Sequence, residues 1–285
     1  MGSLFDFEHK TDHYAVMGNP ISHSKSPKIH QLFAQQTHQN IDYQAIQVDD
    51  GGFPQAVGNF FANGGKGLNI TVPFKQQAFD LVDHISDRAK LSKAVNTLAI
   101  RDNGEIFGDN TDGIGLVRDL EQNHNISLAN KSLLLVGAGG AARGIIPSLI
   151  ESGIRRIHIV NRTAKRADDL RDEFISLMDV EASSFESMPA DDFDIIINAS
   201  ASSLQGEIPP IPDSAINPHT CCYDLMYAAE ATSFLRWAAS KGIKAGYDGL
   251  GMLVEQAAES FYIWRGKHAQ TAPVIQALKA EMRAQ

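Results

Sequence analysis

The sequence predicts an α/β protein with two domains, the second of them a doubly wound parallel sheet. Short apolar runs alternate with longer amphipathic stretches, which is the pattern of strand–helix–strand units. The chain has 285 residues, more than a single domain usually contains. One run, 132–136, is continuously apolar, as expected for a strand covered by helices on both faces of a parallel sheet.

The first part of the chain, up to about residue 112, alternates between predicted strands and helices. Pro27 stands at the start of a helix, where its missing N–H costs nothing, and Pro73 ends a strand. Apolar residues at helical spacing follow Pro27 at positions 29, 32 and 33. We expect helices from 26 onward, at 53–61 and at 74–85, and strands at 14–17, 43–48, 67–72, 94–101 and from 105 onward.

The second part begins with a predicted helix at 111–122 and ends with another at 251–264. Between them lie short apolar runs separated by helical stretches. We expect strands at 132–136, 156–160, 194–198, 221–224 and 244–247. The boundary between the two domains is expected near Asp112.

Composition excludes several classes of protein. The formal net charge of −9 argues against a nucleic-acid surface, which needs a basic stripe. The two cysteines, Cys221 and Cys222, are adjacent, which suits neither a structural zinc site nor a disulfide framework, so no metal is expected. There is no secretory signal and no run of about 18 apolar residues, so we expect a cytoplasmic protein without a membrane partner.

A glycine-rich loop follows the run 132–136. It reads Gly137-Ala138-Gly139-Gly140-Ala141-Ala142, the G-x-G-x-x-A form of the dinucleotide-binding loop. The glycines permit a tight turn and a close approach of the backbone to a pyrophosphate, and the N-terminus of the next helix supplies N–H donors. The alternative is a plain glycine-rich turn. Because strand, loop, helix and second strand occur in the order that the motif requires, we predict dinucleotide binding.

The residues after the second strand of this unit indicate which dinucleotide is bound. An NAD site usually places a carboxylate there to bind the ribose 2′-hydroxyl. The chain instead has Asn161-Arg162-Thr163-Ala164-Lys165-Arg166. A guanidinium can bind a 2′-phosphate through paired hydrogen bonds, so the cluster favours NADP. The alternative is that these cations are solvated charges at a helix start, where they oppose the helix dipole.

The first part of the chain offers a candidate acid–base pair. Lys75 follows Pro73 in the first turn of a predicted helix, where the helix dipole would lower the lysine pKa and suit it to proton transfer. Asp112 could hold and orient that ammonium group. Each has a simpler interpretation, since Lys75 could be an exposed surface lysine and Asp112 could merely cap the following helix.

Several polar residues could contact a small anionic or polyhydroxy ligand. Ser22 and Ser24 place two hydroxyls on one side of a turn, and Thr71 shares a strand face with Asn69. Asn96 is a polar residue within an apolar run and needs hydrogen-bond partners. Gln256 lies on a largely apolar helix face, and the Gly249-Leu-Gly251 segment before it permits close approach of the backbone to a ligand. A serine-rich turn and an isolated structural amide are the alternatives.

Taken together, these segments resemble the shikimate dehydrogenase family. The matches occur in the family's order from about residue 14 to residue 264. The segments that carry the resemblance are Gly18-Asn-Pro-Ile-Ser-His-Ser-Lys-Ser-Pro27, Asn69-Ile-Thr-Val-Pro-Phe-Lys75, Ala94-Val-Asn-Thr97, Gly108-Asp-Asn-Thr-Asp-Gly113, Gly137-Ala-Gly-Gly-Ala141, Asn161-Arg-Thr163, Tyr223-Asp-Leu-Met-Tyr227 and Asp248-Gly-Leu-Gly-Met-Leu-Val-Glu-Gln256.

The resemblance implies a domain order and a reaction. Residues 1–112 would form an α/β substrate domain, 113–247 a Rossmann-type NADP domain, and 248–285 helices that return to the first domain, with a cleft between the two. The implied reaction is reversible, NADP-dependent reduction of the C3 carbonyl of 3-dehydroshikimate to shikimate, a step toward chorismate and the aromatic amino acids. The implied enzyme is a monomer or a homodimer.

The resemblance also assigns roles to single residues. Lys75 and Asp112 would be the catalytic pair, with Lys75 as the proton donor to the developing alkoxide. Ser22 and Ser24 would hold the ring carboxylate. The remaining roles are substrate contacts for Thr71, Asn96, Tyr227 and Gln256, nicotinamide contacts for Leu225 and Gly249, and an acidic position near the cofactor for Asp87.

Two other functions fit part of this pattern. A broader quinate and shikimate dehydrogenase would share the motifs, although such enzymes often use NAD, which the basic cluster argues against. A non-catalytic NADPH-binding sensor would explain the glycine loop but would leave Lys75, Asp112 and the serines without a purpose.

Overall fold

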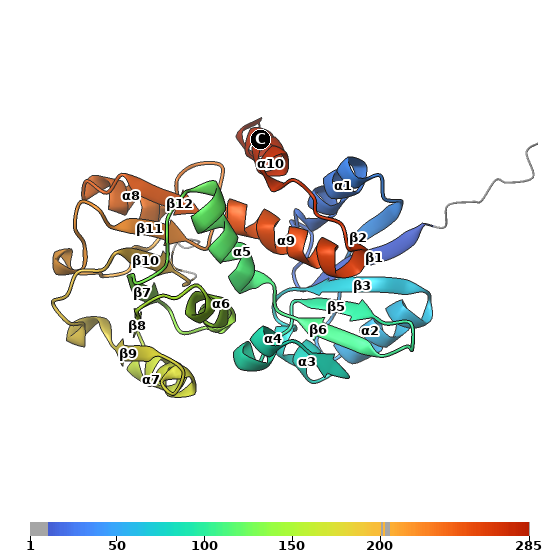
Figure 1. Cartoon of the computed structure of the whole chain (residues 1–285), viewed down its shortest axis with the longest axis horizontal. Coiled ribbons are helices and arrows are strands. Elements are labelled where there is room, and N and C mark those ends of the chain that lie inside the picture. The colour runs from blue at the N-terminus through green and yellow to red at the C-terminus, as the bar shows by residue number, and fades with distance from the viewer. Residues whose placement is uncertain (1–10, 201, 203–205, 285) are drawn as a thin grey trace, which may run out of the picture. The chain divides into compact units, whose positions relative to one another are not determined.

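The computed structural model describes residues 11–200, 202 and 206–284. The chain divides into two compact units (Figure 1). The first unit comprises residues 1–111 and 257–270, and the second comprises 112–256 and 271–285. The division falls after Thr111, so Asp112 opens the second unit. Of the C-terminal segment expected to return to the first domain, only 257–270 belongs to the first unit.

The first unit is built on a six-stranded mixed sheet with the order β2-β1-β3-β5-β6-β4. Its strands are β1 (Asp12–Gly18), β2 (Ile41–Gln47), β3 (Gly65–Ile70), β4 (His84–Ile85), β5 (Thr97–Ile100) and β6 (Ile106–Asp109). Strands β1, β2 and β3 are parallel, whereas β5 is antiparallel to both β3 and β6. The helices are α1 (Ser26–Thr37), α2 (Phe53–Ala62), α3 (Lys75–Phe79) and α4 (Asp87–Ser92).

The prediction of one helix at 74–85 is wrong. The segment forms the five-residue helix α3 and then the short strand β4, which pairs with β6. Asp83 explains the change, because its backbone N–H donates to the Ile106 carbonyl at 2.9 Å and its carboxylate accepts from the Ile106 N–H at 2.8 Å. This pairing partner lies more than twenty residues further along the chain, outside any local helical pattern.

The second unit is built on a parallel six-stranded sheet with the order β12-β11-β10-β7-β8-β9. Its strands are β7 (Ser132–Val136), β8 (Arg156–Val160), β9 (Asp179–Ser183), β10 (Ile195–Asn198), β11 (Cys221–Asp224) and β12 (Ala245–Asp248). The strand order reverses between β7 and β10, and this switch point is where doubly wound sheets bind nucleotides. The edge strand β9 was not predicted, because only Val180 of its five residues is buried.

Helices complete the second unit. They are α5 (Asp112–Arg118), α6 (Gly140–Glu151), α7 (Ala164–Phe174), α8 (Ser233–Ser240), α9 (Leu250–Arg265) and α10 (Thr271–Ala284). Helix α9 begins in the second unit, and its residues from Ala257 onward belong to the first. The predicted helix at 111–122 is α5 followed by a π-helical turn, η1 (Asp119–Asn123).

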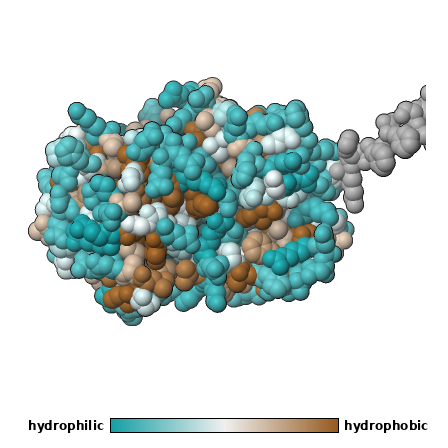
Figure 2. Space-filling view, in the orientation of Figure 1, coloured by the Kyte–Doolittle hydropathy of each residue, from teal (hydrophilic) through white to brown (hydrophobic). Residues whose placement is uncertain are grey.

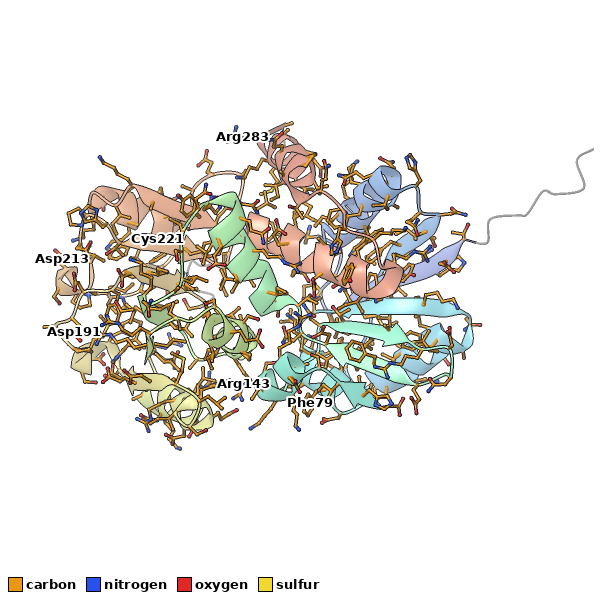
Figure 3. All side chains as sticks on the ribbon, viewed as in Figure 1. Phe79, Arg143, Asp191, Asp213, Cys221 and Arg283 are labelled. Atoms are coloured by element: carbon orange, nitrogen blue, oxygen red, sulfur yellow. The ribbon has the colours of Figure 1, made fainter. Side chains whose placement is uncertain are left out.

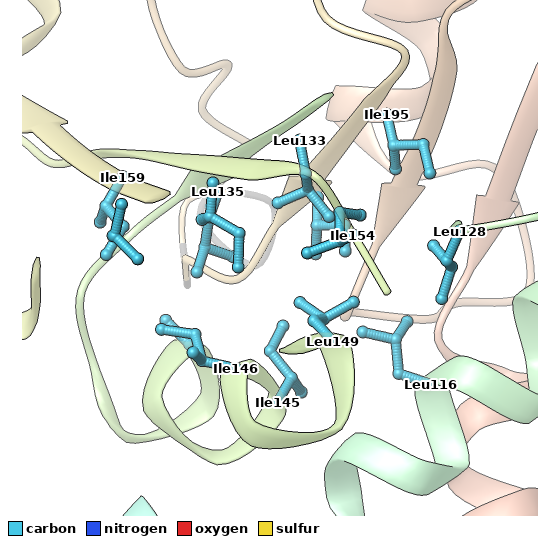
Figure 4. Packing of buried hydrophobic residues seen from close by; sticks show 14 of the residues in the cluster. Leu116, Leu128, Leu133, Leu135, Ile145, Ile146, Leu149, Ile154, Ile159 and Ile195 are labelled. Atoms are coloured by element: carbon cyan, nitrogen blue, oxygen red, sulfur yellow. The ribbon is translucent and has the colours of Figure 1, made fainter. Parts of the chain in front are cut away.

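The core beneath the glycine loop is apolar. Leu133 and Leu135 of β7 point toward Ile145, Ile146 and Leu149 of α6, and all five are fully buried (Figure 4). The thiol of Cys221 is buried in the same unit (Figure 3), and burial raises its pKa to about 12, which leaves it unreactive near neutral pH. Because the apolar run of β7 packs on α6, it fixes the position at which the glycine loop leaves the sheet.

Hydrophilic residues cover most of the face shown in Figure 2, with hydrophobic residues scattered among them. Among the described residues, no helix has the length and the apolar character needed to cross a bilayer.

Asp119 is a buried carboxylate at the start of the π-helical turn. It accepts hydrogen bonds from Tyr223 Oη at 2.7 Å and Asn123 Nδ2 at 2.9 Å, and His124 Nε2 lies 3.6 Å away. A Cβ atom on Gly251 would lie 1.9 Å from Asp119 Oδ1, so only glycine fits at this position. Burial by itself raises the pKa of this carboxyl, but the hydrogen bonds from His124, Tyr223 and Asn123 outweigh it and lower the pKa.

Replacing Asp119 by asparagine is expected to lower the free energy of unfolding near neutral pH by about 1–3 kcal/mol, because buried donors lose a charged acceptor. Since the pKa is depressed in the folded state, this stabilisation exists above the ordinary aspartate pKa and is lost as pH falls through the folded-state value. Urea unfolding of the parent and Asp119→Asn from neutral to acidic pH measures it. The difference should shrink on acidification, and a constant difference would contradict the ionic role.

Candidate functional site

The glycine loop of the second unit has the geometry of an anion cradle. Gly137 has φ +106°, a left-handed conformation that favours glycine, and a Cβ there would lie 3.2 Å from the backbone of Ala199 and Ser200. The loop ends where α6 begins at Gly140, with Gly139 as its N-cap. A Cβ at Gly139 or Gly140 would meet no atom within 4 Å, so space is open at the N-terminus of this twelve-residue helix.

A cavity of about 260 Å³ lies beside this loop within the second unit. Of the predicted cofactor residues, Gly137, Asn161 and Arg162 line it. Asn161 is held by a hydrogen bond from its Nδ2 to the Thr163 carbonyl at 2.9 Å. The structure therefore brings the glycine loop and the first cation after β8 to one cavity, as a dinucleotide site requires.

The other predicted cations lie at the start of α7. The Lys165 ammonium forms an ion pair with Asp169 one turn later, and its side chain is 79% exposed. The hydrogen bond and charge of Asp169 raise the pKa of Lys165. Asp169 thus accounts for the charge of Lys165, and Arg162 is the better candidate to bind an external anion. Neither Lys165 nor Arg166 is among the described residues that line the cavity.

Sequence reasoning missed the opposite wall of this cavity. Ser200 and Ser202 follow β10, and their hydroxyls lie 2.7 Å apart, with Ser200 Oγ also donating to Asn198 Oδ1 at 2.7 Å. No local pattern in the sequence points to these serines, because the adjacency of the ends of β10 and β7 follows from the strand order of the sheet. The other missed lining residues are Phe185, Glu207, Ile208, Pro209 and Pro210.

A second group of predicted residues lies close together in the second unit. The Leu225 N–H donates to the Asn198 carbonyl at 2.9 Å, which places Leu225 at the switch point. A Cβ on Gly249 would lie 2.2 Å from the Leu225 carbonyl oxygen, so this glycine is required by the chain itself. Burial, with the nearby Asp248 charge, raises the pKa of Tyr227 and keeps its phenol protonated. Leu225 and Gly249 are therefore neighbours, as their predicted shared role requires.

Gln256 is half-buried on α9. Its Nε2 donates to the Leu253 carbonyl at 2.9 Å, and a Cβ on Gly115 of α5 would lie 2.7 Å from the Gln256 Cβ. The hydrogen bond and the close packing of α9 on α5 thus fix the orientation of the Gln256 amide. Its contact with a substrate hydroxyl stays a prediction.

The serine turn of the first unit precedes α1. The Ser26 N–H donates to Ser24 Oγ at 3.3 Å, and the Ser24 N–H donates to the Ile21 carbonyl at 3.0 Å. Ser22 is exposed and Ser24 is half-buried. Ser24 therefore helps to start the helix, while the exposed Ser22 hydroxyl is accessible to a ligand.

Thr71 and Lys75 lie on either side of Pro73, after the end of β3. The Thr71 N–H donates to the Met17 carbonyl at 2.9 Å, and the Lys75 carbonyl accepts from the Val95 N–H at 2.9 Å. Both side chains are half-buried. Lys75 begins α3, as expected. Because α3 has only five residues, its dipole acts on Lys75 more weakly than that of the longer predicted helix would.

Asp112 is the first residue of α5 and is buried. In the segment before it, Asn110 Nδ2 donates to Ser92 Oγ at 3.1 Å, and the Thr111 N–H donates to Asn96 Oδ1 at 2.9 Å. Lys75 belongs to the first unit and Asp112 begins the second, so their pairing stays a prediction. Asp87 is exposed at the start of α4, after the N-cap Ser86.

An ionic cluster within the first unit fixes the segment before Asp112. Arg88 donates to the Asp109 carboxylate at 2.8 and 2.6 Å and to Glu259 of α9 at 2.9 Å. Asp109 also accepts from the Asn110 N–H at 2.7 Å. Two anions around one half-buried guanidinium, each hydrogen-bonded to it, hold the end of β6 in one conformation.

Three family models match consecutive parts of the chain. The shikimate dehydrogenase substrate-binding domain matches residues 16–98, the shikimate/quinate 5-dehydrogenase model matches 119–205, and the shikimate 5′-dehydrogenase C-terminal domain matches 249–279. The chain is also 51% identical, over 95% of its length and 100% of the relative's, to shikimate dehydrogenase (NADP(+)) of Alkalilimnicola ehrlichii. The chain belongs to the shikimate dehydrogenase family.

Solved structures agree with membership in the shikimate dehydrogenase family. Shikimate 5-dehydrogenase of Thermus thermophilus, in complex with NADP(H) and shikimate, superimposes with a TM-score of 0.84 at 30% identity, covering 95% of this chain and 99% of that one. An Ael1 enzyme from Pseudomonas putida superimposes with a TM-score of 0.89 at 43% identity, covering 94% of this chain and 98% of that one. The family's two-domain α/β architecture is thus the fold of this chain, as the sequence predicted.

Proposed function

We propose that the chain is an NADP-dependent shikimate dehydrogenase, which reversibly reduces the C3 carbonyl of 3-dehydroshikimate to shikimate. The observation that carries the proposal is the match, at about half identity over nearly the whole chain, to relatives named shikimate dehydrogenase (NADP(+)). The cavity beside the glycine loop supports the cofactor, since it combines a left-handed glycine, an open helix N-terminus and Arg162. NADPH, when bound, would supply the hydride for the reduction, and NADP⁺ would accept it in the reverse direction.

The chain's own residues would bind the ligands and move the proton. In our proposal the loop 137–141 accommodates the pyrophosphate and Arg162 binds the 2′-phosphate, with Asn161, Thr163, Lys165, Arg166 and Asp87 around them. Leu225 and Gly249 would contact the nicotinamide. Ser22 and Ser24 would hold the substrate carboxylate, and Thr71, Asn96, Tyr227 and Gln256 would meet the rest of the ring.

Lys75 and Asp112 are proposed as the catalytic pair. As the carbonyl accepts a hydride, negative charge develops on its oxygen, and an ammonium group can donate a proton there. Asp112 would orient that ammonium group toward the oxygen. In the reverse direction the neutral amine would accept the proton from the shikimate hydroxyl.

The purified chain should reduce NADP⁺ in the presence of shikimate, with a rise in absorbance as NADPH forms. We expect a higher kcat/KM for shikimate than for quinate, and for NADP⁺ than for NAD⁺, because NAD⁺ lacks the phosphate that Arg162 would bind. Efficient quinate oxidation with NAD⁺ would instead identify the broader quinate/shikimate activity. Tight NADPH binding without turnover of either substrate would identify a sensor.

We also propose that the enzyme acts in the cytoplasm as a monomer or a homodimer. The unpaired thiols of Cys221 and Cys222 support a reducing compartment. Cell fractionation and analytical ultracentrifugation test these two statements.

A further inference from the structure

A ring of buried polar side chains lies in the first unit and includes the proposed substrate residue Asn96. Its members are Asn96, Thr97, Thr111 and Ser260, and we call it the Ser260 ring. All four side chains are buried, and Ser260 is supplied by α9, far along the chain. Buried hydroxyls and amides are costly unless each finds a partner, so the pattern of partners is informative.

Backbone groups fix the orientation of two amides, those of Asn96 and Asn69. The Thr111 N–H can only donate, so the atom that it meets at 2.9 Å must be Asn96 Oδ1. The Asn96 carbonyl can only accept, so the atom 3.3 Å from it must be Asn69 Nδ2, which also donates to Ser260 Oγ at 3.0 Å. Contacts with main-chain groups therefore determine which side-chain atom is oxygen and which is nitrogen in Asn96 and Asn69.

The hydroxyl directions follow from these two amides. Ser260 donates to Thr97 Oγ1 at 2.8 Å, and Thr97 donates to Asn96 Oδ1 at 2.9 Å. Asn96 Nδ2 donates to Thr111 Oγ1 at 3.0 Å. The Thr111 hydroxyl lies 3.2 Å from Asn96 Oδ1 and 3.3 Å from Ser260 Oγ, and it can donate to either. The four side chains are thus joined into one hydrogen-bonded group. Such chains of hydrogen bonds polarise one another, so the ring acts as a unit.

We propose that Ser260 is a positioning residue of the dehydrogenase, which closes this ring and sets the orientation of Asn96 toward the substrate. Asn96 Oδ1 is already occupied by the Thr111 N–H and the Thr97 hydroxyl. With that oxygen held inside the ring, we assign the Nδ2 side of Asn96, which also donates to Thr111 Oγ1 at 3.0 Å, to an acceptor oxygen of the substrate. This inference rests on the proposed function, because it takes Asn96 as a substrate contact.

The ring also connects Ser260 to the segment that carries Asp112. Thr111 is a ring member and immediately precedes Asp112 in the chain. Glu259, the neighbour of Ser260 on α9, accepts from Arg88, which holds Asp109. Two consecutive residues of α9 thus hold the segment 109–111. Glu259 acts through its ion pair with Arg88, and Ser260 acts through its hydroxyl contacts with Thr97 and Thr111. Loss of Ser260 should therefore affect the substrate step and leave NADP binding unchanged, since Arg162 and the glycine loop belong to the other unit.

Steady-state kinetics of Ser260→Ala test this proposal. We expect about a tenfold rise in the shikimate KM, a fall in kcat and a KM for NADP⁺ within about twofold of the parent value, because one hydrogen-bonded link is lost. Thr97→Val removes the next link without changing shape and should give the same pattern. In the double variant, the shikimate KM should lie within about twofold of the value for the more impaired single variant, since both changes break one ring.

Phe261→Leu is the matched control. Phe261 is the next residue of α9, is fully buried and packs on His30 and Phe33, so its loss lowers thermal stability without breaking the ring. The proposal is overturned if folded Ser260→Ala keeps its shikimate KM within twofold, if Phe261→Leu reproduces the kinetic change, or if the two single effects multiply. If Ser260→Ala does not fold, Thr97→Val decides by the same criteria. An inactive parent chain would instead overturn the proposed function.

Discussion

Replacing Lys75 by alanine is expected to lower kcat for shikimate oxidation by about two to four orders of magnitude, while NADPH affinity stays nearly unchanged. A positioned general acid or base contributes about 10²–10⁴ to the rate of a proton transfer. The Lys75 backbone is fixed from two sides, by α3 and by the hydrogen bond from the Val95 N–H, so truncation of its side chain should leave the fold intact. Stopped-flow kinetics and fluorescence titration with NADPH measure the two quantities.

Lys66→Ala is the control for Lys75→Ala. Lys66 is an exposed lysine on β3 of the same unit, and its removal makes the same change in net charge. It should leave kcat within about twofold, as is usual for a surface substitution. If Lys75→Ala keeps most of the activity, or if cofactor affinity falls in parallel with kcat, the catalytic role of Lys75 is wrong.

Replacing Arg162 by serine is expected to raise the KM for NADP⁺ by about ten- to a hundredfold and to leave the KM for NAD⁺ almost unchanged. A hydrogen bond between charged groups contributes about 1.5–3 kcal/mol, which corresponds to this range. Arg162 is the predicted cation that lines the cavity, whereas Lys165 is paired with Asp169. The corresponding change at Lys165 should therefore have a much smaller effect, and kinetics with both cofactors measure all of these values.

Arg155→Ser provides the matched control for Arg162→Ser. Arg155 is exposed and precedes β8, whereas Arg162 follows it, so the two arginines lie at opposite ends of one strand. Loss of Arg155 should leave both cofactor KM values within about twofold. Equal losses for NADP⁺ and NAD⁺ in Arg162→Ser would show that Arg162 supports the loop in general and does not select the 2′-phosphate.

Local features of the chain were readable from the sequence alone. The glycine loop after β7 was found because strand, turn and helix start are neighbours in sequence, and Gly137 does adopt the left-handed conformation that the motif needs. The order of apolar runs likewise predicted a two-domain α/β fold. These features depend on short-range patterns, which one sequence contains in full.

Features that depend on distant partners were missed or misjudged. Strand β4 was predicted as helix because its partner, β6, lies further along the chain. Packing within the chain also requires small residues at Gly249 and Gly251, since a Cβ there would meet the Leu225 carbonyl or the Asp119 carboxylate. Ser200 was overlooked because the adjacency of β10 and β7 follows only from the strand order.

The sequence by itself determined the fold class, the family, the glycine loop and the set of residue types available for catalysis. Tertiary structure alone decided which residues have partners far along the chain: Asn96 a ring that includes Ser260, and Asp109 an arginine shared with α9. The physical reason is range. Helix, strand and turn preferences act over a few residues, whereas hydrogen bonds and ion pairs depend on atoms within a few ångströms, and only the folded chain brings those atoms together.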